Sequence, residues 1–286
     1  MNNTQKSAGI RKSWCWNRGC CGCISIVILA FVSFYGLYFL MRGPLPIDPQ
    51  LIAHRGGPVY QPENTLAAFQ HAIDVGADWL EFDVQRSRDG VLVVIHDETV
   101  DRTTDGSGKI MALTFEQIQA LDAGSGERVP TFAEVITLAQ TTGVGLMPEA
   151  KSPHLYPGIE AQMVAALEGG GMVDQAVVQS FDSRSLVEVH RANPELDICP
   201  LYGLWQLRLN EVEPGEAELV CPMAEMVLIN PWMIRQAHQQ GKNVYVWFGI
   251  IENPLVMRLL LVMGADGLMV DDPLVLAEIL TGYGSP

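Results

Sequence analysis

Short apolar runs alternate with segments of helical period along most of this chain, and this alternation constrains the fold more than any other feature. Such a pattern is typical of βα units, in which helices join parallel strands. The apolar runs predict strands at 51–54, 79–85, 144–150, 176–181, 197–202, 226–230, 243–249 and 267–270. The segments between them predict helices at 64–75, 132–142, 157–168, 183–192, 231–240, 253–263 and 273–281, whereas 204–222 fits neither pattern.

Eight predicted strands within residues 51–281 fit an α/β fold of the (β/α)8 TIM-barrel type. A doubly wound open sheet is the alternative. No strand is followed by a Gly-x-Gly-x-x-Gly turn, which disfavours the dinucleotide-binding form of that alternative. We therefore expect a TIM barrel.

One stretch, about residues 86–130, interrupts the alternation and predicts a small insertion after strand 2 of the barrel. It holds a second strand-like run behind Asp89-Gly90, a pair that favours a two-residue hairpin turn. With such a turn, the register of the two strands places Asp83 opposite His96. The hairpin thus predicts a histidine beside a strand carboxylate.

Two carboxylates lie in apolar surroundings on one predicted strand. Glu81 and Asp83 are two residues apart, so their side chains point to the same face of the strand. Barrel strands are buried on both faces, and two inward carboxylates repel each other unless a cation lies between them. Glu149, on the next barrel strand, adds a third oxygen ligand, and such ligands suit Ca²⁺ or Mg²⁺ better than zinc. A polar strand face that meets water is the alternative.

Two histidines, His54 at the end of the first strand and His96, flank these carboxylates. A lone histidine at a strand end is more often structural than catalytic. Two of them beside a metal site can act as the acid and the base of an in-line displacement.

Two cationic side chains accompany the histidines. Arg55 is a fork-shaped donor for a phosphate, with a buried ion pair to Glu63 as the equally weighted alternative. Lys151, two residues after Glu149, points to the same face and is expected to be a second phosphate contact. Asn64 is expected to cap the first helix.

These residues belong to an ordered set of motifs. The set reads His54-Arg-Gly56, Pro62-Glu-Asn-Thr65, Glu81-Phe-Asp-Val84, Asp89-Gly90, His96-Asp97, Glu149-Ala-Lys151, Ser180-Phe181 and Asp266-Gly267. Over about residues 51–276 it resembles the glycerophosphodiester phosphodiesterase family. The Pro148-Glu-Ala-Lys151 form, with Pro153 nearby, is similar to the periplasmic branch of that family.

The resemblance implies a (β/α)8 barrel and a divalent cation, Ca²⁺ or Mg²⁺, at an acid–base site. The implied metal ligands are Glu81, Asp83 and Glu149, and the implied acid and base are His54 and His96. Phosphate contact or site orientation is implied for Arg55, Glu63 and Lys151. The expected reaction is hydrolysis of a glycerophosphodiester to sn-glycerol 3-phosphate and an alcohol.

Two departures from the family pattern concern the substrate more than the cleavage. Where the family usually has Trp-Thr-Val-Asn, this chain has Trp247-Phe-Gly-Ile250, and Val270 replaces a common threonine. Trp247 is expected to form a wall of the substrate pocket, with core packing as the alternative. A lysophospholipase D-like activity on a membrane lysophospholipid is a second hypothesis. A catalytically silent, membrane-tethered binding module is a third.

The N-terminal region predicts a membrane anchor. Residues 24–41 form an uncharged apolar run that would be roughly 27 Å long as a helix, close to the thickness of a bilayer core. A core helix and a cleavable signal peptide are the alternatives, but no small-x-small cleavage site follows the run. Basic residues precede it, so residues 1–23 are expected in the cytoplasm. The linker 42–50 would then lead to an extracytoplasmic barrel, periplasmic in a bacterium.

Charge restricts the partners. The formal net charge is -15, although the only charged residues in 1–42 are basic, namely Lys6, Arg11, Lys12, Arg18 and Arg42. The acidic remainder argues against nucleic-acid binding, which requires a basic face. It is compatible with a small anionic substrate, because local cations can reverse the sign within one cleft. Cys199 and Cys221 permit a disulfide in the exported part but do not imply one.

Overall fold

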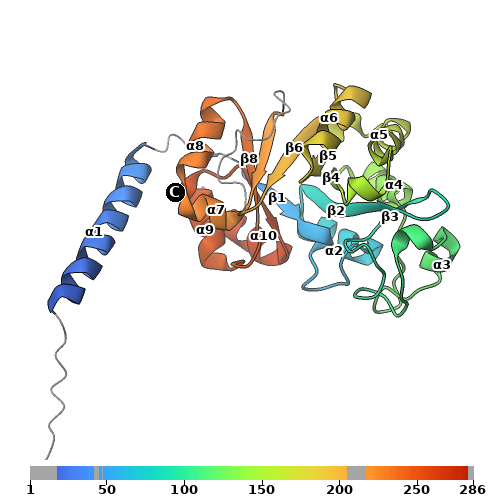
Figure 1. The fold of residues 1–286 in the computed structure, drawn as a ribbon, viewed down its shortest axis with the longest axis horizontal. Coiled ribbons are helices and arrows are strands. Elements are labelled where there is room, and N and C mark those ends of the chain that lie inside the picture. Colours follow the sequence, from blue (N-terminus) through green and yellow to red (C-terminus); the bar gives the residue numbers. More distant parts are fainter. Residues whose placement is uncertain (1–17, 42–44, 47, 205–216, 283–286) are drawn as a thin grey trace, which may run out of the picture. The chain divides into compact units, whose positions relative to one another are not determined.

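The computed structural model of the protein describes residues 18–41, 45–46, 48–204 and 217–282, and its larger unit, Arg42–Pro286, is a closed barrel (Figure 1). Its parallel strands are β1 (Gln50–Ala53), β2 (Trp79–Arg86), β4 (Gly145–Ala150), β5 (Val177–Ser180), β6 (Asp197–Tyr202), β7 (Leu219–Pro222), β8 (Asn243–Trp247) and β9 (Gly267–Val270). They pair in that order, and β1 pairs with both β9 and β2. This closure confirms the predicted TIM barrel and excludes the open sheet.

Helices cover the outside of the barrel. They are α2 (Leu66–Val75), α4 (Phe132–Thr142), α5 (Ile159–Gly169), α6 (Ser183–Ala192), α7 (Ala224–Ile229), α8 (Trp232–Gln239), α9 (Pro254–Met263) and α10 (Pro273–Thr281). Short 3₁₀ turns lie at η1 (His54–Gly56), η2 (Ile110–Ala112), η3 (Pro153–Leu155) and η4 (Val173–Gln175). Most helices thus begin and end within two residues of the predicted bounds.

One predicted strand is wrong. Residues 226–230 lie in and just after α7, and the barrel strand in this part of the chain is β7, within the segment 204–222 that fitted neither pattern. Leu219 pairs with Asn243 of β8 and Cys221 pairs with Leu201 of β6, so β7 already fills the strand position. A short apolar run does not distinguish a strand from a buried helix.

The predicted insertion forms a small lobe beyond β2. It contains β3 (Leu92–Val94), antiparallel to β2, and α3 (Phe115–Gln119) (Figure 1). The lobe has an apolar cluster of its own, made of Val93, Ile95, Val100, Ile110, Ile118, Ala123 and Val129. It therefore holds its shape while contributing residues to the mouth of the barrel.

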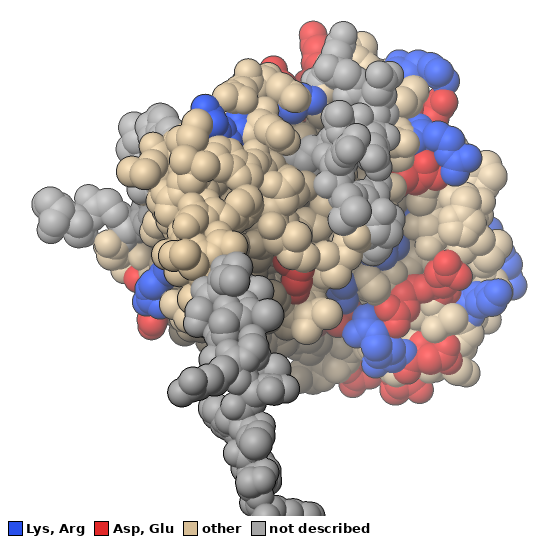
Figure 2. Space-filling model, turned by 60° about the vertical axis from the view of Figure 1, so that its left-hand side comes forward, with Lys and Arg blue, Asp and Glu red and all other residues tan. Residues whose placement is uncertain are grey.

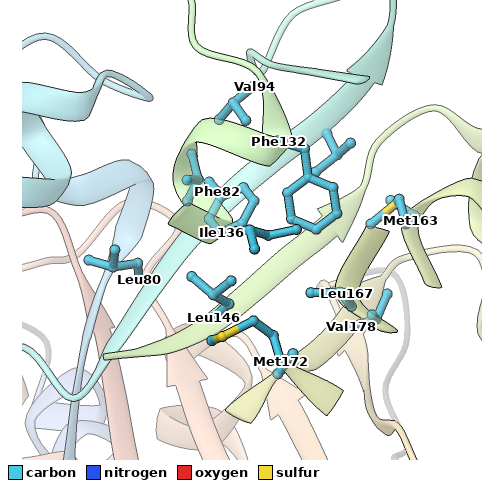
Figure 3. Close-up of a cluster of buried hydrophobic side chains, with 14 of the residues drawn as sticks. Leu80, Phe82, Val94, Phe132, Ile136, Leu146, Met163, Leu167, Met172 and Val178 are labelled. Atoms are coloured by element: carbon cyan, nitrogen blue, oxygen red, sulfur yellow. The ribbon is translucent and has the colours of Figure 1, made fainter. Parts of the chain in front are cut away.

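Alternation along the strands divides the core into two layers. Outward-facing residues such as Phe82 and Val178 form one apolar cluster with side chains of the surrounding helices, among them Phe132 of α4 and Met163 of α5 (Figure 3). The Phe82 and Phe132 ring centroids are 5.6 Å apart. Inward-facing apolar residues fill the barrel itself, namely Ile52, Met147, Val177, Cys199, Leu201, Leu219, Cys221, Tyr245 and Met269. Residues next to Phe82 on β2 consequently point into the barrel.

The smaller unit, Met1–Met41, contains α1 (Arg18–Met41), which includes the predicted membrane span. No helical stretch in the part of the chain that the structure describes is both long and apolar enough to cross a membrane. Residues 1–17 of the predicted cytoplasmic segment lie outside the described residues, as do 42–44 and 47 of the predicted linker. The anchor stays a prediction.

Cys199 and Cys221 form a disulfide inside the barrel, and both side chains are fully buried. It joins the neighbouring strands β6 and β7 across a separation of 22 residues. A cross-link of this length stabilises a protein by about 3 kcal/mol, chiefly by restricting the unfolded chain.

We expect the Cys199→Ala/Cys221→Ala double variant to lose about 3 kcal/mol of unfolding free energy, because its unfolded state gains conformational freedom. Urea unfolding of both proteins measures the loss, and a reductant should lower the stability of the wild type alone. Equal stability of the two proteins without reductant would contradict the expectation.

Candidate active site

The predicted site residues gather at the carboxyl ends of the barrel strands. One cavity of about 410 Å³ is lined by seven of them, namely His54, Arg55, Glu63, His96, Glu149, Lys151 and Trp247. The other two, Glu81 and Asp83, lie buried on β2, each 1% exposed. All nine therefore belong to one region, although they come from segments nearly 200 residues apart.

Three carboxylates form an acidic group inside the barrel mouth. Glu81, Asp83 and Glu149 each offer an oxygen atom, and these oxygens lie within 4.8 Å of one another. The register of β2 and β4 places Asp83 directly beside Glu149. The alternative of a water-facing strand surface is wrong, because Glu149 is only 6% exposed and the other two less.

Burial and mutual repulsion set the charge of this group. Burial, with repulsion from Asp83, raises the pKa of Glu81 and also that of Glu149. Burial alone would also raise the pKa of Asp83, but the Lys151 and Arg55 cations outweigh it and lower that pKa. Asp83 thus stays ionised at lower pH than the two glutamates, whose ionisation an added positive charge would favour.

Neighbouring polar groups hold these carboxylates in place. The Lys151 ammonium lies 3.3 Å from Asp83 Oδ1 and 3.1 Å from Glu149 Oε2. The Asn64 amide donates to Asp83 Oδ2 at 2.9 Å, and the Gln179 amide donates to Glu81 Oε1 at 2.8 Å. Asn64 is therefore not the cap of α2 that we predicted, since Thr65 accepts the capping hydrogen bond from Ala68.

The donor set fits a hard divalent cation. All three acidic ligands are oxygen atoms, which Ca²⁺ and Mg²⁺ prefer. The Gln179 side-chain oxygen is also buried and has no hydrogen-bond partner among the described residues. A buried acceptor without a donor is costly, so this part of the mouth has unused capacity to bind a positive group.

A strained turn after β1 presents His54 and Arg55. Arg55 has a positive φ of 50°, and its backbone N–H donates to Glu81 Oε2 at 2.9 Å. Gly57, at φ 84°, allows close packing, because an added Cβ would lie 2.7 Å from the Pro273 ring. The glycines after Arg55 thus let the chain turn sharply beside the carboxylates.

His54 is oriented by a carboxylate that the sequence analysis did not single out. Its Nδ1 lies 2.6 Å from Asp271 Oδ1, and its Nε2 lies 3.9 Å from Glu81. Burial opposes protonation of His54, but Glu81 and the hydrogen bond to Asp271 outweigh it and raise the pKa of His54. The Glu252 carboxylate in turn accepts the backbone N–H groups of Asp271 and Asp272.

Glu252 gives the departures from the family pattern a structural context. The segment after Trp247 lacks the usual polar residues, yet it supplies this carboxylate four residues beyond Phe248. Glu252 binds the backbone directly after Val270, where threonine is common in the family. The position of Asp271 is therefore held from the β8–α9 loop despite the missing polar side chains.

The predicted register of the hairpin is wrong by one residue. Val84 pairs with Val94, so Asp83 faces Ile95 rather than His96. The turn has three residues, because Ser87 N–H donates to the Val91 carbonyl and Gly90 has a positive φ of 91°. A third loop residue shifts the pairing by one. His96 still lies near Asp83. Burial lowers the pKa of His96, and the negative charge of Asp83 offsets only part of that effect.

An ion-pair network holds His96 and Arg55 from the insertion side. His96 Nδ1 lies 2.6 Å from Asp97 Oδ1, and Arg102 makes two hydrogen bonds to Asp97 and two to Glu63. Glu63 also accepts from Arg55 at 3.1 Å. The predicted ion pair between Arg55 and Glu63 is therefore present, while the Arg55 fork still borders the cavity.

Trp247 forms part of the cavity wall. Its indole N–H donates to the Tyr202 carbonyl at 3.2 Å, and its ring meets Phe181 edge to face at 5.5 Å. It is half-buried and lines the cavity, so it packs in the barrel and also borders the space for a substrate.

Several residues of the site escaped the sequence analysis. Asp97 and Asp271 orient the two histidines. Asn64 and Gln179 donate hydrogen bonds to Asp83 and Glu81. Arg102 links Asp97 to Glu63. Asp97 was quoted within a motif without a role. The alternation of β2 and its neighbours gave a usable signal for Gln179, which pairs in register with Glu149.

Comparisons with known proteins agree with this geometry. Residues 54–275 match the glycerophosphoryl diester phosphodiesterase family. The chain belongs to that family. It is 36% identical over 247 residues to a glycerophosphodiester phosphodiesterase of Caldanaerobacter subterraneus subsp. tengcongensis. This match covers 82% of this chain and 98% of the relative. The protein is thus an enzyme, a phosphoric diester hydrolase, which argues against the catalytically silent module.

Solved structures share the fold. A glycerophosphodiester phosphodiesterase from Agrobacterium tumefaciens is 28% identical with a TM-score of 0.70, covering 80% of this chain and 99% of its own. An Oleispira antarctica phosphodiesterase, 28% identical with a TM-score of 0.69, was solved in complex with the product sn-glycerol-3-phosphate. That match covers 82% of this chain and 98% of the other.

We expect the calcium-induced rise in Tm to grow as the pH rises from about 5 to about 8. The raised pKa values of Glu81 and Glu149 mean that the folded protein without a cation retains protons that binding must release. Thermal unfolding with and without calcium at both pH values measures the difference. Glu149→Gln should reduce the rise, and an equal rise at both pH values would contradict the expectation.

Proposed function

We propose that the enzyme hydrolyses glycerophosphodiesters to sn-glycerol 3-phosphate and an alcohol, with a divalent cation and two histidines. The observation that carries this proposal is the shared cavity. Two histidines, each with Nδ1 held by an aspartate, border the same cavity as Glu149, whose carboxylate lies within 4.8 Å of those of Glu81 and Asp83. The Oleispira relative, solved with sn-glycerol-3-phosphate, supports this product class.

A cation held by Glu81, Asp83 and Glu149 would polarise the phosphoryl group and offset its negative charge. The side chains that bind the substrate anion would be Arg55 and Lys151, both at the cavity wall. Lys151 is paired with two of the carboxylates, so a cation among them would release its ammonium toward the phosphate.

Charge outside the site gives the substrate little attraction. Lysine and arginine are interspersed with acidic side chains on the face in Figure 2, and the net charge of the chain is -15. Binding of an anionic diester therefore depends on the local cations of the cavity, which act at short range in a partly buried setting.

The histidines would move the protons. In each, the aspartate at Nδ1 fixes the ring, so Nε2 is the atom that exchanges a proton with the substrate. One histidine accepts the proton of the attacking hydroxyl as its oxygen bonds to phosphorus. The other donates a proton to the alcohol oxygen as its bond to phosphorus breaks. Water or the glycerol 2-hydroxyl is the attacking group, and the second choice forms a cyclic phosphate first.

The location of the barrel outside the cytoplasm is part of the proposal. Two features support it: the basic residues before the apolar segment 24–41, and the Cys199–Cys221 disulfide. Structural disulfides persist mainly in oxidising compartments. The segment 24–41 would then anchor the enzyme in the membrane.

His54→Ala and His96→Ala should each lower kcat for glycerophosphocholine by at least about 100-fold, because each removes one proton-transfer group. Steady-state kinetics with calcium measures the loss, and Tm reports folding. His190→Ala, on α6, is the matched control and should leave kcat unchanged. Wild-type activity in a folded His54 or His96 variant would defeat the acid–base assignment.

A lysophospholipid is a second candidate substrate, favoured by one feature of the β8–α9 loop. Phe248 and Gly249 line the cavity, and the next two residues, Ile250 and Ile251, are 85% and 39% exposed. Glu225 accepts both of their backbone N–H groups, so the loop is held firmly while it exposes its isoleucines. Residues 248–251 would then give an acyl chain an apolar path from the cavity to the surface.

If that path binds an acyl chain, Ile250→Glu should lower turnover of lysophosphatidylcholine about tenfold and that of glycerophosphocholine less than twofold. Ile229→Glu, at an exposed isoleucine on α7, is the matched control. Equal effects of Ile250→Glu on the two substrates, or no measurable turnover of the lysophospholipid by the wild type, would exclude this second candidate.

A further inference from the structure

Gln85 is a buried polar residue that the mechanism so far does not use. It follows Glu81 and Asp83 at the same spacing on β2, so all three side chains point to the same face of the strand. Its side chain is fully buried. A buried amide needs partners for both its oxygen and its nitrogen, and those partners reveal what the residue holds.

The Gln85 amide nitrogen lies against three consecutive backbone carbonyls. Its two hydrogens are shared among the carbonyl oxygens of Ile95 at 3.2 Å, of His96 at 2.9 Å and of Asp97. The chain leaves the β2–β3 ladder at this point, after Ile95 N–H donates to the Asp83 carbonyl. The backbone of residues 95–97 therefore bends around the Gln85 side chain. Gln85 lies on β2, the strand that also holds Glu81 and Asp83.

Tyr156 fixes the orientation of that amide. Its hydroxyl donates to Gln85 Oε1 at 2.8 Å, and its ring is 2% exposed. Burial raises the pKa of Tyr156 to about 12, so the hydroxyl keeps its proton. If the amide flipped, its oxygen would face three carbonyl oxygens, and all of them are acceptors. Tyr156 thus favours the orientation in which the Gln85 amide donates to the carbonyl groups of residues 95–97.

These contacts account for the placement of His96 better than the strand pairing does. The three-residue turn shifts the register, so the ladder itself ends with Ile95 opposite Asp83. Beyond that point, the Gln85 amide and the ion pairs of Asp97 fix the backbone and the ring. The first acts on the main chain and the second on the side chain.

We propose that Gln85, oriented by Tyr156, is a positioning residue that holds the backbone of residues 95–97 so that His96 reaches the phosphoryl group. This inference rests on the proposed function, because it takes His96 as a proton-transfer residue. Gln85 touches neither the substrate nor the acidic group and acts only through the histidine.

Two variants test the inference on the whole chain. Gln85→Met keeps the length of the side chain but cannot donate, and Gln85→Glu keeps the acceptor for Tyr156 but turns the donor into an acceptor. Both should lower kcat for glycerophosphocholine by about 30-fold or more, while KM and the calcium affinity change less than about threefold. Tyr156→Phe, which leaves the Gln85 donors in place, should cause a smaller fall in kcat.

A double-mutant cycle separates positioning from general stability. In a His96→Ala background, where the positioned group is absent, Gln85→Met should lower the residual kcat by less than about twofold. A purely structural role would instead lower it by the same factor in both backgrounds. Where Gln85→Met does not fold, the cycle is run with Tyr156→Phe.

The outcomes divide cleanly. A fall in kcat that disappears in the His96→Ala background supports the inference. Wild-type kcat in folded Gln85→Met and Gln85→Glu overturns it, as does an equal fall in both backgrounds or a parallel loss of calcium affinity. In these cases His96→Ala alone still lowers kcat by at least about 100-fold, so the proposed function survives. An active His96→Ala variant overturns both.

Discussion

Repulsion among three carboxylates in the barrel mouth is the constraint on which the rest of the site depends. Carboxylate oxygens of Glu81, Asp83 and Glu149 lie within 4.8 Å of one another, and all three residues are buried. Like charges so close cannot all ionise without compensation. Lys151 and Arg55 compensate in part, since their side-chain nitrogens lie 3.3 Å and 3.4 Å from the Asp83 carboxylate. A divalent cation would complete the compensation and leave the two basic side chains for an anionic substrate.

The histidines are supported by different segments of the chain at the same mouth. His54 is held by Asp271, whose backbone is fixed by Glu252, so its support comes from the end of the barrel sequence. His96 is held by Asp97 and by contacts from the insertion and β2. The two histidines, which we propose as the proton-transfer groups, are thus held by separate sets of contacts. Closure of the sheet between β1 and β9 brings the two supports into one cavity.

Much of this arrangement follows from sequence patterns, and the remainder depends on contacts between distant segments. Strand alternation predicts the barrel and the shared face of Glu81 and Asp83, because both follow from local geometry. It does not predict β7, since a short apolar run nearby competed for the strand. Nor does it reveal the partnership of His54 with Asp271, which are 217 residues apart in the sequence. The hairpin pattern predicts that His96 lies near Asp83, but it does not predict the strand register. The register depends on the length of the loop, which the positive φ of Gly90 helps to set.

A crystal structure of the enzyme with calcium and sn-glycerol 3-phosphate would decide whether the three carboxylates hold a cation at the site of phosphate binding. We expect one cation, identified by its anomalous signal, bound by oxygens of Glu81, Asp83 and Glu149. We also expect that the phosphate contacts this cation and that the Lys151 ammonium has moved from the carboxylates to the phosphate. A phosphate bound elsewhere, or Lys151 still between Asp83 and Glu149 with no cation among them, would contradict the account.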